Sequence, residues 1–168
     1  MVPNPETKVG SLISVMLLEA GNHILWFAFT PIEYSVAEWM GGQYASDPSK
    51  IALYGTVTTP VSFLTGILAA YYFDAKGIYL PLMIGAWSTI PCCALRIGAT
   101  YIASVDVRNT MFICSGLLCG LSLAMTSFAP TKVAAVWFND KERVFANTLM
   151  AMMLEAGILF SYIVSPLK

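Results

Sequence analysis

Five long apolar runs constrain the fold of this chain more than any other feature. A helix that crosses a bilayer needs about 20 mostly apolar residues, and each of the five runs reaches that length. Because backbone polar groups in hydrocarbon must be hydrogen-bonded within their own segment, such runs favour helices. The sequence therefore predicts an all-α integral membrane protein, a single domain over residues 1–168 with five transmembrane helices. We expect these helices near residues 9–34, 51–73, 78–102, 111–138 and 144–167.

Composition assigns the chain to a lipid bilayer and argues against other classes of protein. Of its 168 residues, 57% are hydrophobic and 11% are charged, whereas soluble domains carry about 25% charged residues. The formal net charge of -1 supplies no basic patch for phosphates. The lipid bilayer is therefore an expected partner, and nucleic acid is not.

The pattern of cysteine and histidine residues predicts neither a metal site nor an enzyme. The four cysteines lie inside apolar runs without Cys-x-x-Cys spacing, which is typical of small buried hydrophobic side chains. They are Cys92, Cys93, Cys114 and Cys119. With one histidine, no Ser/His/Asp constellation and no glycine-rich phosphate loop, we expect no catalytic residues and no cofactor.

The connections between the runs differ in length. Residues 35–50 contain Gly41-Gly42 and predict a loop, while only Asp74 to Gly77 separate the second and third runs. A link of four residues predicts an antiparallel helical hairpin.

Two features inside the runs bear on helix packing. Gly116-xxx-Gly120 predicts a close approach of two helix backbones, either within the chain or between chains. Arg96 lies toward the end of the third run, where it either extends to the interface or pairs with a carboxylate.

Polar residues in the first run form a stripe. If residues 9–34 are one helix, six polar or aromatic residues fall within about 100° of one another. They are Glu19, Asn22, His23, Trp26, Thr30 and Glu33. Glu155 is the one charged residue inside the apolar part of the fifth run. Ionisable residues within a membrane usually serve a function, but each of these side chains equally fits a satisfied contact between helices.

Four stretches together resemble one transporter family. They are NHILWFAFTPIEY in the first run, FDAKGIYLPLMIGAW across the hairpin, ALRIGA at the end of the third run, and APTKVAAVWFNDKE at the end of the fourth. The chain resembles the N-terminal half of a major facilitator superfamily transporter, closest to the feline leukaemia virus subgroup C receptor family. That family is associated with transport of choline, ethanolamine and haem.

The resemblance implies roles for particular residues. Asn22 and Trp26 match the family's asparagine and tryptophan that line the substrate cavity, and Trp26 would face a quaternary ammonium group. Glu155 falls where the family has a cavity glutamine, a departure that favours a cation over a neutral or anionic substrate. Asp74 and Gly77 match the Asp-xx-Gly gating loop, but the basic residues that normally follow it are absent.

The number of runs leads to two functional hypotheses. A transporter of this superfamily has two six-helix halves with the substrate between them, whereas this chain has five runs. We therefore expect a truncated half that cannot transport alone and serves as an accessory subunit of a larger membrane complex, for instance in the respiratory chain. The alternative is half of a transporter for choline-like cations or haem.

The two hypotheses predict different partners and different membranes. An accessory subunit would contact other membrane subunits, with its polar stripe on their helices or on a bound lipid, in the mitochondrial inner membrane. A transporter would bind a choline-like cation or haem and lie in the plasma membrane.

Overall fold

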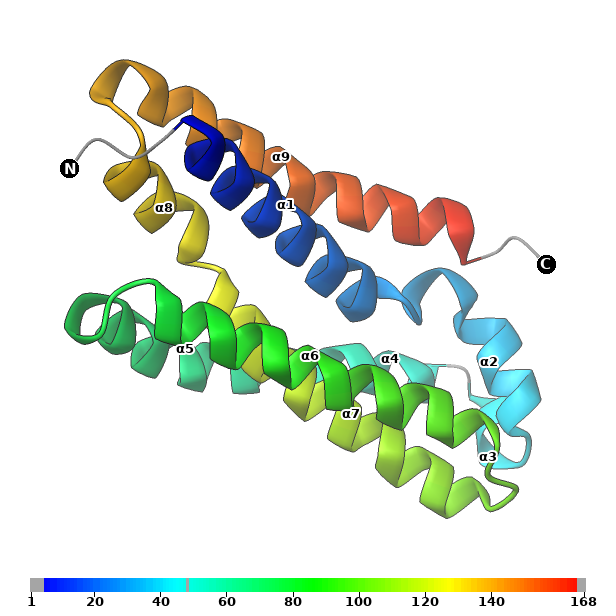
Figure 1. Ribbon diagram of the computed structural model, residues 1–168. Coiled ribbons are helices and arrows are strands. Elements are labelled where there is room, and N and C mark those ends of the chain that lie inside the picture. Colours follow the sequence, from blue (N-terminus) through cyan, green and yellow to red (C-terminus); the bar gives the residue numbers. More distant parts are fainter. Residues whose placement is uncertain (1–4, 48, 166–168) are drawn as a thin grey trace.

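The computed structural model describes residues 5–47 and 49–165, and every regular element in those ranges is helical (Figure 1). The elements are α1 (Pro5–Phe27), the 3-10 helix η1 (Thr30–Ile32), α2 (Glu33–Met40), α3 (Gln43–Ser46), α4 (Ser49–Thr56), α5 (Thr58–Ala75), α6 (Tyr79–Thr100), α7 (Val105–Thr126), α8 (Ala129–Trp137) and α9 (Asp140–Val164).

These helices combine into five stretches that are long and apolar enough to cross a membrane. The five are Glu6–Met40, Ser49–Ala75, Tyr79–Thr100, Val105–Trp137 and Asp140–Val164. The predicted all-α membrane fold with five transmembrane helices is therefore confirmed. Residues 166 and 167 of the last predicted helix lie outside the described residues.

The structure corrects two of the predicted boundaries. Residues 35–50 are not a loop throughout, because α2 continues to Met40 and ends only where Gly41 and Gly42 take φ angles of 72° and 56°. The fourth span begins at Val105, before the predicted residue 111, because Arg108 is accommodated inside it. The Arg108 guanidinium carbon lies 4.1 Å from the Trp39 ring centroid, which offsets part of the cost of burying a cation.

Prolines interrupt three of the spans. Pro31 lies in η1, Pro60 in the first turn of α5 and Pro130 in the first turn of α8. Proline has no amide N–H, so each one removes the helical donor for the carbonyl four residues earlier. As a result α1, α4 and α7 each end in mid-span, and the chain continues as a second helix.

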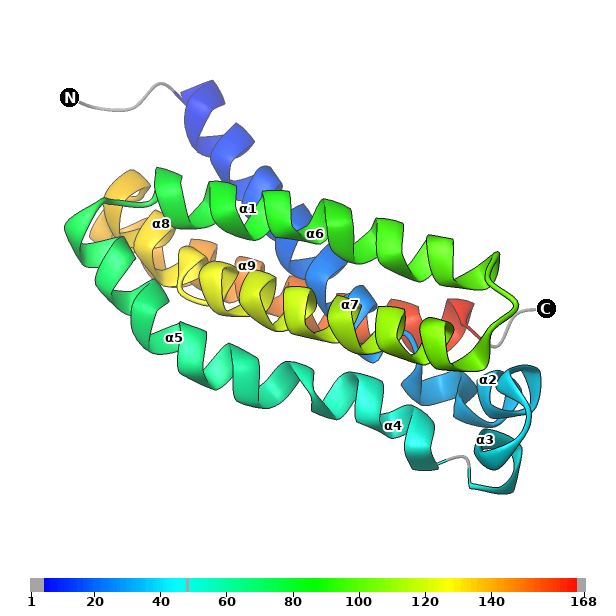
Figure 2. The same cartoon turned by 90° about the horizontal axis from the view of Figure 1, so that it is seen from below.

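Helix α7 lies at the centre of the bundle. Figure 2 shows α7 between α6 on one side and the α4–α5 line on the other, and α9 runs alongside α1 in Figure 1. Glycines allow these close approaches: a Cβ at Gly116 would lie 2.8 Å from the Tyr54 carbonyl oxygen, and one at Gly120 would lie 2.6 Å from the Thr58 carbonyl oxygen. The Gly-xxx-Gly pair is therefore used within the chain.

The outer surface of the bundle is apolar. Large side chains such as Leu17, Phe63 and Trp87 are more than half exposed, at 65%, 72% and 63%. An exposed apolar surface of this kind suits contact with lipid acyl chains or with further membrane helices.

Candidate functional site

The polar residues of α1 occupy two different environments, and Asn22 lies in the first of them. Its side chain is 1% exposed and reaches both α6 and α7. The amide nitrogen Nδ2 donates to Thr126 Oγ1 at 3.1 Å, while Oδ1 accepts from Ser122 Oγ at 2.9 Å and from Thr89 Oγ1 at 3.2 Å. We call these four residues the Asn22 node.

The hydroxyl groups of the Asn22 node are bonded to one another and to the backbone as well. Thr89 Oγ1 and Ser122 Oγ lie 2.9 Å apart, and Ser122 Oγ also lies 2.8 Å from the carbonyl oxygen of Gly85. A Cβ added at Gly85 would lie 2.8 Å from the Thr126 methyl group, so a glycine is needed for α6 to approach α7 here. The node therefore fastens α1, α6 and α7 together and saturates Asn22 Oδ1.

Glu19 and His23 form the second environment, on the same helix. Their side chains are 3% and 5% exposed. His23 Nδ1 donates to the main-chain carbonyl of Glu19 at 2.8 Å and lies 3.7 Å from Glu19 Oε2, too far for a hydrogen bond. Among the described residues none is hydrogen-bonded to Glu19 Oε1.

Trp26 lies half-buried between two small cavities. Its Nε1 donates to the carbonyl oxygen of Gly55 in α4 at 3.3 Å, and its ring centroid is 5.9 Å from that of His23. The indole contributes to a cavity of about 260 Å³ with Thr30 and Glu33, and to one of about 330 Å³ with His23.

The predicted stripe is not one continuous helix face. Because α1 ends at Phe27, Thr30 lies in η1 and Glu33 begins α2, so the 100° geometry holds only as far as Trp26. Glu155 is exposed on α9 and interacts electrostatically with His23. His23 is thus the residue that the others share: it contacts Glu19 and the Trp26 ring and interacts with Glu155, and substrate binding by these residues stays a prediction.

Arg96 corrects a prediction made from the sequence. No described carboxylate pairs with it, because Nη1 donates to the carbonyl of Leu25 in the last turn of α1 and Nε donates to Ser115 Oγ at 3.3 Å. Its extension to the membrane interface stays a prediction. Its guanidinium carbon also lies 4.9 Å from the Phe29 ring centroid. Arg96 therefore supplies a donor to the carbonyl end of α1 where that helix is interrupted.

The hairpin between α5 and α6 is held by an exposed ion pair. Asp74 Oδ1 is bonded to Lys132 Nζ of α8, and Gly77 has a φ of 79°, which glycine adopts without strain. The Asp-xx-Gly loop thus contacts the end of the fourth span. A gating role for it remains a prediction.

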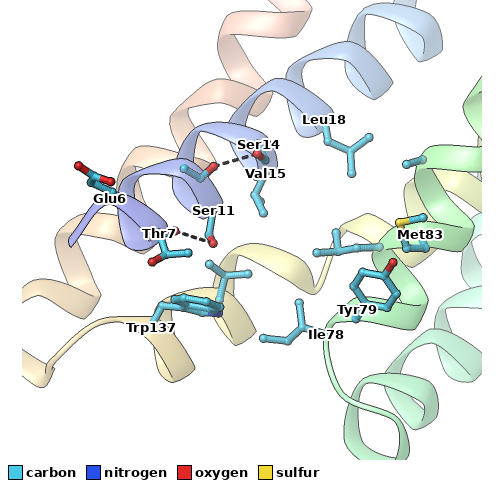
Figure 3. A pocket seen from close by; sticks show the side chains of 14 residues that line it. Glu6, Thr7, Ser11, Ser14, Val15, Leu18, Ile78, Tyr79, Met83 and Trp137 are labelled. Atoms are coloured by element: carbon cyan, nitrogen blue, oxygen red, sulfur yellow. Dashed lines mark hydrogen bonds between the residues drawn. The ribbon is translucent and has the colours of Figure 1, made fainter. Parts of the chain in front are cut away.

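An apolar groove lies on the other side of α1. It encloses about 1000 Å³ between the first half of α1, the start of α6 and α8. Figure 3 shows Ser11 and Ser14 of α1 across an open space from Tyr79 and Ile78. Both serine hydroxyls donate to α1 carbonyls four residues earlier, at 2.8 Å each, so they offer no free donor to the groove.

The cysteines differ in exposure. Cys92 and Cys119 are buried and Cys93 is partly buried, but Cys114 is exposed on the apolar outer surface, which corrects the prediction that all four are buried. The described residues contain no cluster of three or more His, Cys, Asp or Glu side chains that could hold a metal ion.

The sequence reasoning missed the partners of Asn22. Thr89, Ser122 and Thr126 are hydroxyl residues in apolar helices, and such side chains usually bond their own backbone. The available signal was spacing: Ser115, Ser122 and Thr126 are separated by seven and four residues and so share one face of α7.

Comparison with known proteins places the chain near one group of solute carriers. It is 29% identical over 160 residues to Solute carrier family 49 member A3 of Danio rerio, a match that covers 93% of this chain and 32% of that protein. The corresponding protein of Xenopus tropicalis is 26% identical over 156 residues, covering 90% and 32%. An uncharacterized protein of Caenorhabditis elegans is 26% identical over 156 residues, covering 92% and 30%.

These matches support the resemblance to a transporter family, but each match covers only part of the relative's length. The chain spans about a third of the length of the curated relatives it matches. No family model matches the chain, and no solved structure matches it. That the fold is half of a major facilitator bundle therefore remains a prediction.

Proposed function

We propose that this chain forms one wall of a passage for an organic cation through a membrane, and that it catalyses no chemical step. The observation that carries the proposal is that His23 lies 5.9 Å from the Trp26 ring, centroid to centroid, and interacts electrostatically with Glu155, in a bundle whose relatives include solute carriers. An exposed carboxylate and a partly accessible indole suit a quaternary ammonium group, through charge attraction and cation–π contact respectively. The opposite wall would come from further membrane helices, on the same polypeptide or on a partner.

Within this proposal the roles of Asn22 and Trp26 differ. Asn22 is enclosed by its three hydroxyl partners, so it would position α1 instead of contacting the cation. Trp26 is half-buried, and its Nε1 is occupied by Gly55, so the indole is held in place with part of its surface accessible.

A choline-like cation fits this wall better than haem does. Haem held through an imidazole would call for an accessible histidine, and the one histidine of the chain, His23, is 4% exposed with Nδ1 bonded to its own helix. A small cation requires only the accessible face of Trp26 and the charge of Glu155.

The experiment is uptake of radiolabelled choline into proteoliposomes that contain the full membrane-embedded chain together with the polypeptides that co-purify with it. Trp26→Ala and Glu155→Gln should each lower uptake about tenfold or more, since a desolvated cation–π contact contributes about 2 kcal/mol. Matched controls are Trp87→Ala on the exposed surface of α6 and Glu142→Gln in the first turn of α9. Uptake that is unchanged in the first pair, or lowered equally in the controls, would overturn the proposal.

The second candidate function is an accessory subunit of a larger membrane complex. The observation that favours it is the saturation of Asn22, which turns a family ligand position into a structural one. Native mass spectrometry of gently solubilised material should then show a stable complex with other subunits, while a chain that migrates alone at 18.2 kDa would argue against it. A respiratory complex would place the chain in the mitochondrial inner membrane, and a choline carrier in the plasma membrane.

A further inference from the structure

We propose that Glu19 is the charged ligand of a binding site for one small hard cation, Na⁺, in a cavity between α1, the α7–α8 break and α9. This site is separate from the organic-cation wall and does not depend on whether that wall passes a solute. We call this cavity, of about 180 Å³, the Glu19 cavity. Its lining includes Glu19, Ser127, Thr131, Asn147, Met150 and Leu154.

The starting observation is the unsatisfied carboxyl oxygen of Glu19. The side chain is 3% exposed, and although the Thr126 hydroxyl interacts with the carboxyl group, no described residue is hydrogen-bonded to Oε1. An ionised Oε1 lacks a donor, and a protonated Oε1–H would lack an acceptor within bonding distance. Because an uncompensated buried charge is expensive in a membrane, an ionised Glu19 calls for a further partner at Oε1.

The remaining polar groups that line the cavity are suited to a cation. Ser127 and Thr131 present hydroxyl groups and Asn147 presents an amide. Ser127 Oγ uses its proton on the carbonyl of Leu123 at 2.6 Å, which leaves the lone pairs of that oxygen free. Together with the Glu19 carboxylate, these side chains offer oxygen ligands of the kind that hard cations prefer.

The helix break contributes to the same cavity. Ser127 lies between α7 and α8, and Pro130 follows it on the cavity wall. Since Pro130 has no N–H, the carbonyl of Thr126 loses its helical donor at this point. Interrupted membrane helices commonly supply ion ligands in this manner. Ser127 and Thr131 are exposed, so the cavity reaches the surface of the bundle on that side.

The surrounding charges leave the Glu19 carboxylate available. Glu19 is the one charged residue among the described residues that line the cavity. His23 is the nearest cationic candidate on α1, but a neutral ring protonated at Nδ1 already satisfies the bond to the Glu19 carbonyl. From α9, Glu155 interacts with His23 and adds negative charge to this region. The volume accommodates a cation of sodium size together with water.

The test is thermal unfolding of the full chain in nanodiscs, followed by tryptophan fluorescence, in NaCl or in N-methyl-D-glucamine chloride of equal ionic strength and pH. Saturating Na⁺ should raise the Tm of the wild type by about 2–4 °C, because a ligand that binds only the folded state stabilises it. Glu19→Gln should abolish the difference between the two salts. The matched control Glu38→Gln, exposed on α2, should retain it.

A second variant tests the proposal if Glu19→Gln does not fold. Asn147→Ala removes a partly buried ligand from the opposite wall and should weaken the apparent affinity for Na⁺ about tenfold, measured by titration of the Tm shift. Equal Tm values in the two salts for the wild type would overturn the proposal, as would a Na⁺ shift that survives Glu19→Gln. A Tm that responds to pH but not to Na⁺ would also overturn it, in favour of a protonated carboxyl group.

Discussion

Glu19 and Asn22 are separated by three positions on one helix, and both side chains are nearly inaccessible, yet their surroundings are opposite. Asn22 has three hydroxyl partners from α6 and α7, whereas Glu19 has a carboxyl oxygen with no partner among the described residues. Burial alone therefore does not identify a functional polar residue in a membrane helix. A satisfied side chain fastens helices together, and an unsatisfied one is the better candidate for binding a ligand.

The difference arises from what faces each side chain. α7 directs Ser122 and Thr126 at Asn22, and α6 adds Thr89. Glu19 shares Thr126 with Asn22 but otherwise adjoins the point where α7 is interrupted, and α9 contributes Asn147, Met150, Ala151 and Leu154 there.

The largest expected effect comes from separating α9 from α1, which would disrupt the packing around Glu19. A Cβ at Gly157 would lie 2.6 Å from the Ala20 carbonyl oxygen, so Gly157→Val should lower the free energy of unfolding by about 3 kcal/mol. Gly66→Val is the matched control, because a Cβ there meets nothing within 4 Å. Denaturation of both variants in mixed micelles measures the difference, and equal stabilities would contradict the close α1–α9 contact.

A smaller loss is expected on the Asn22 side. Asn22→Leu keeps the number and branching of the side-chain heavy atoms but removes three hydrogen bonds between helices, each of which contributes about 0.6 kcal/mol in a membrane protein. The free energy of unfolding should fall by about 2 kcal/mol in the same denaturation assay. A variant as stable as the wild type would mean that the Asn22 node does not stabilise the packing of α1 against α6 and α7.

Glu19→Gln should behave in the opposite way when no Na⁺ is present. Because the wild-type carboxyl oxygen has no partner, removing its charge should change the free energy of unfolding by less than about 1 kcal/mol, and any change should be stabilising. Denaturation in N-methyl-D-glucamine chloride measures this. A loss as large as that of Asn22→Leu would show that the two sites are equivalent after all.

The smallest effect is expected at the hairpin, outside both sites. Asp74 and Lys132 have side chains that are 72% and 41% exposed, so Asp74→Asn should cost less than about 0.5 kcal/mol. Thermal unfolding with and without added salt is the measurement. A larger, salt-sensitive loss would indicate that the α5–α6 loop is held more firmly than its exposure suggests.

Much of the fold was predictable, and little of the polar detail was. The five spans followed from apolar runs, although α1 ends at Phe27 and Thr30 and Glu33 therefore leave the predicted stripe. Pro31 was visible in the sequence, but membrane helices often tolerate proline, so its effect here was not predictable from the residue alone. Arg96 illustrates the same limit, since its partner is the carbonyl of Leu25 in another helix.

The sequence by itself determined that this chain spans a membrane as five helices, because hydropathy accumulates over about 20 neighbouring residues and needs no distant partner. Only the tertiary structure decided which polar residues are satisfied. The partners of Asn22 lie 67, 100 and 104 positions away in the chain, and the missing partner of Glu19 is equally a matter of what packs beside it. Hydrogen bonds act over a few ångströms, so saturation depends on helix packing, which local sequence patterns do not specify.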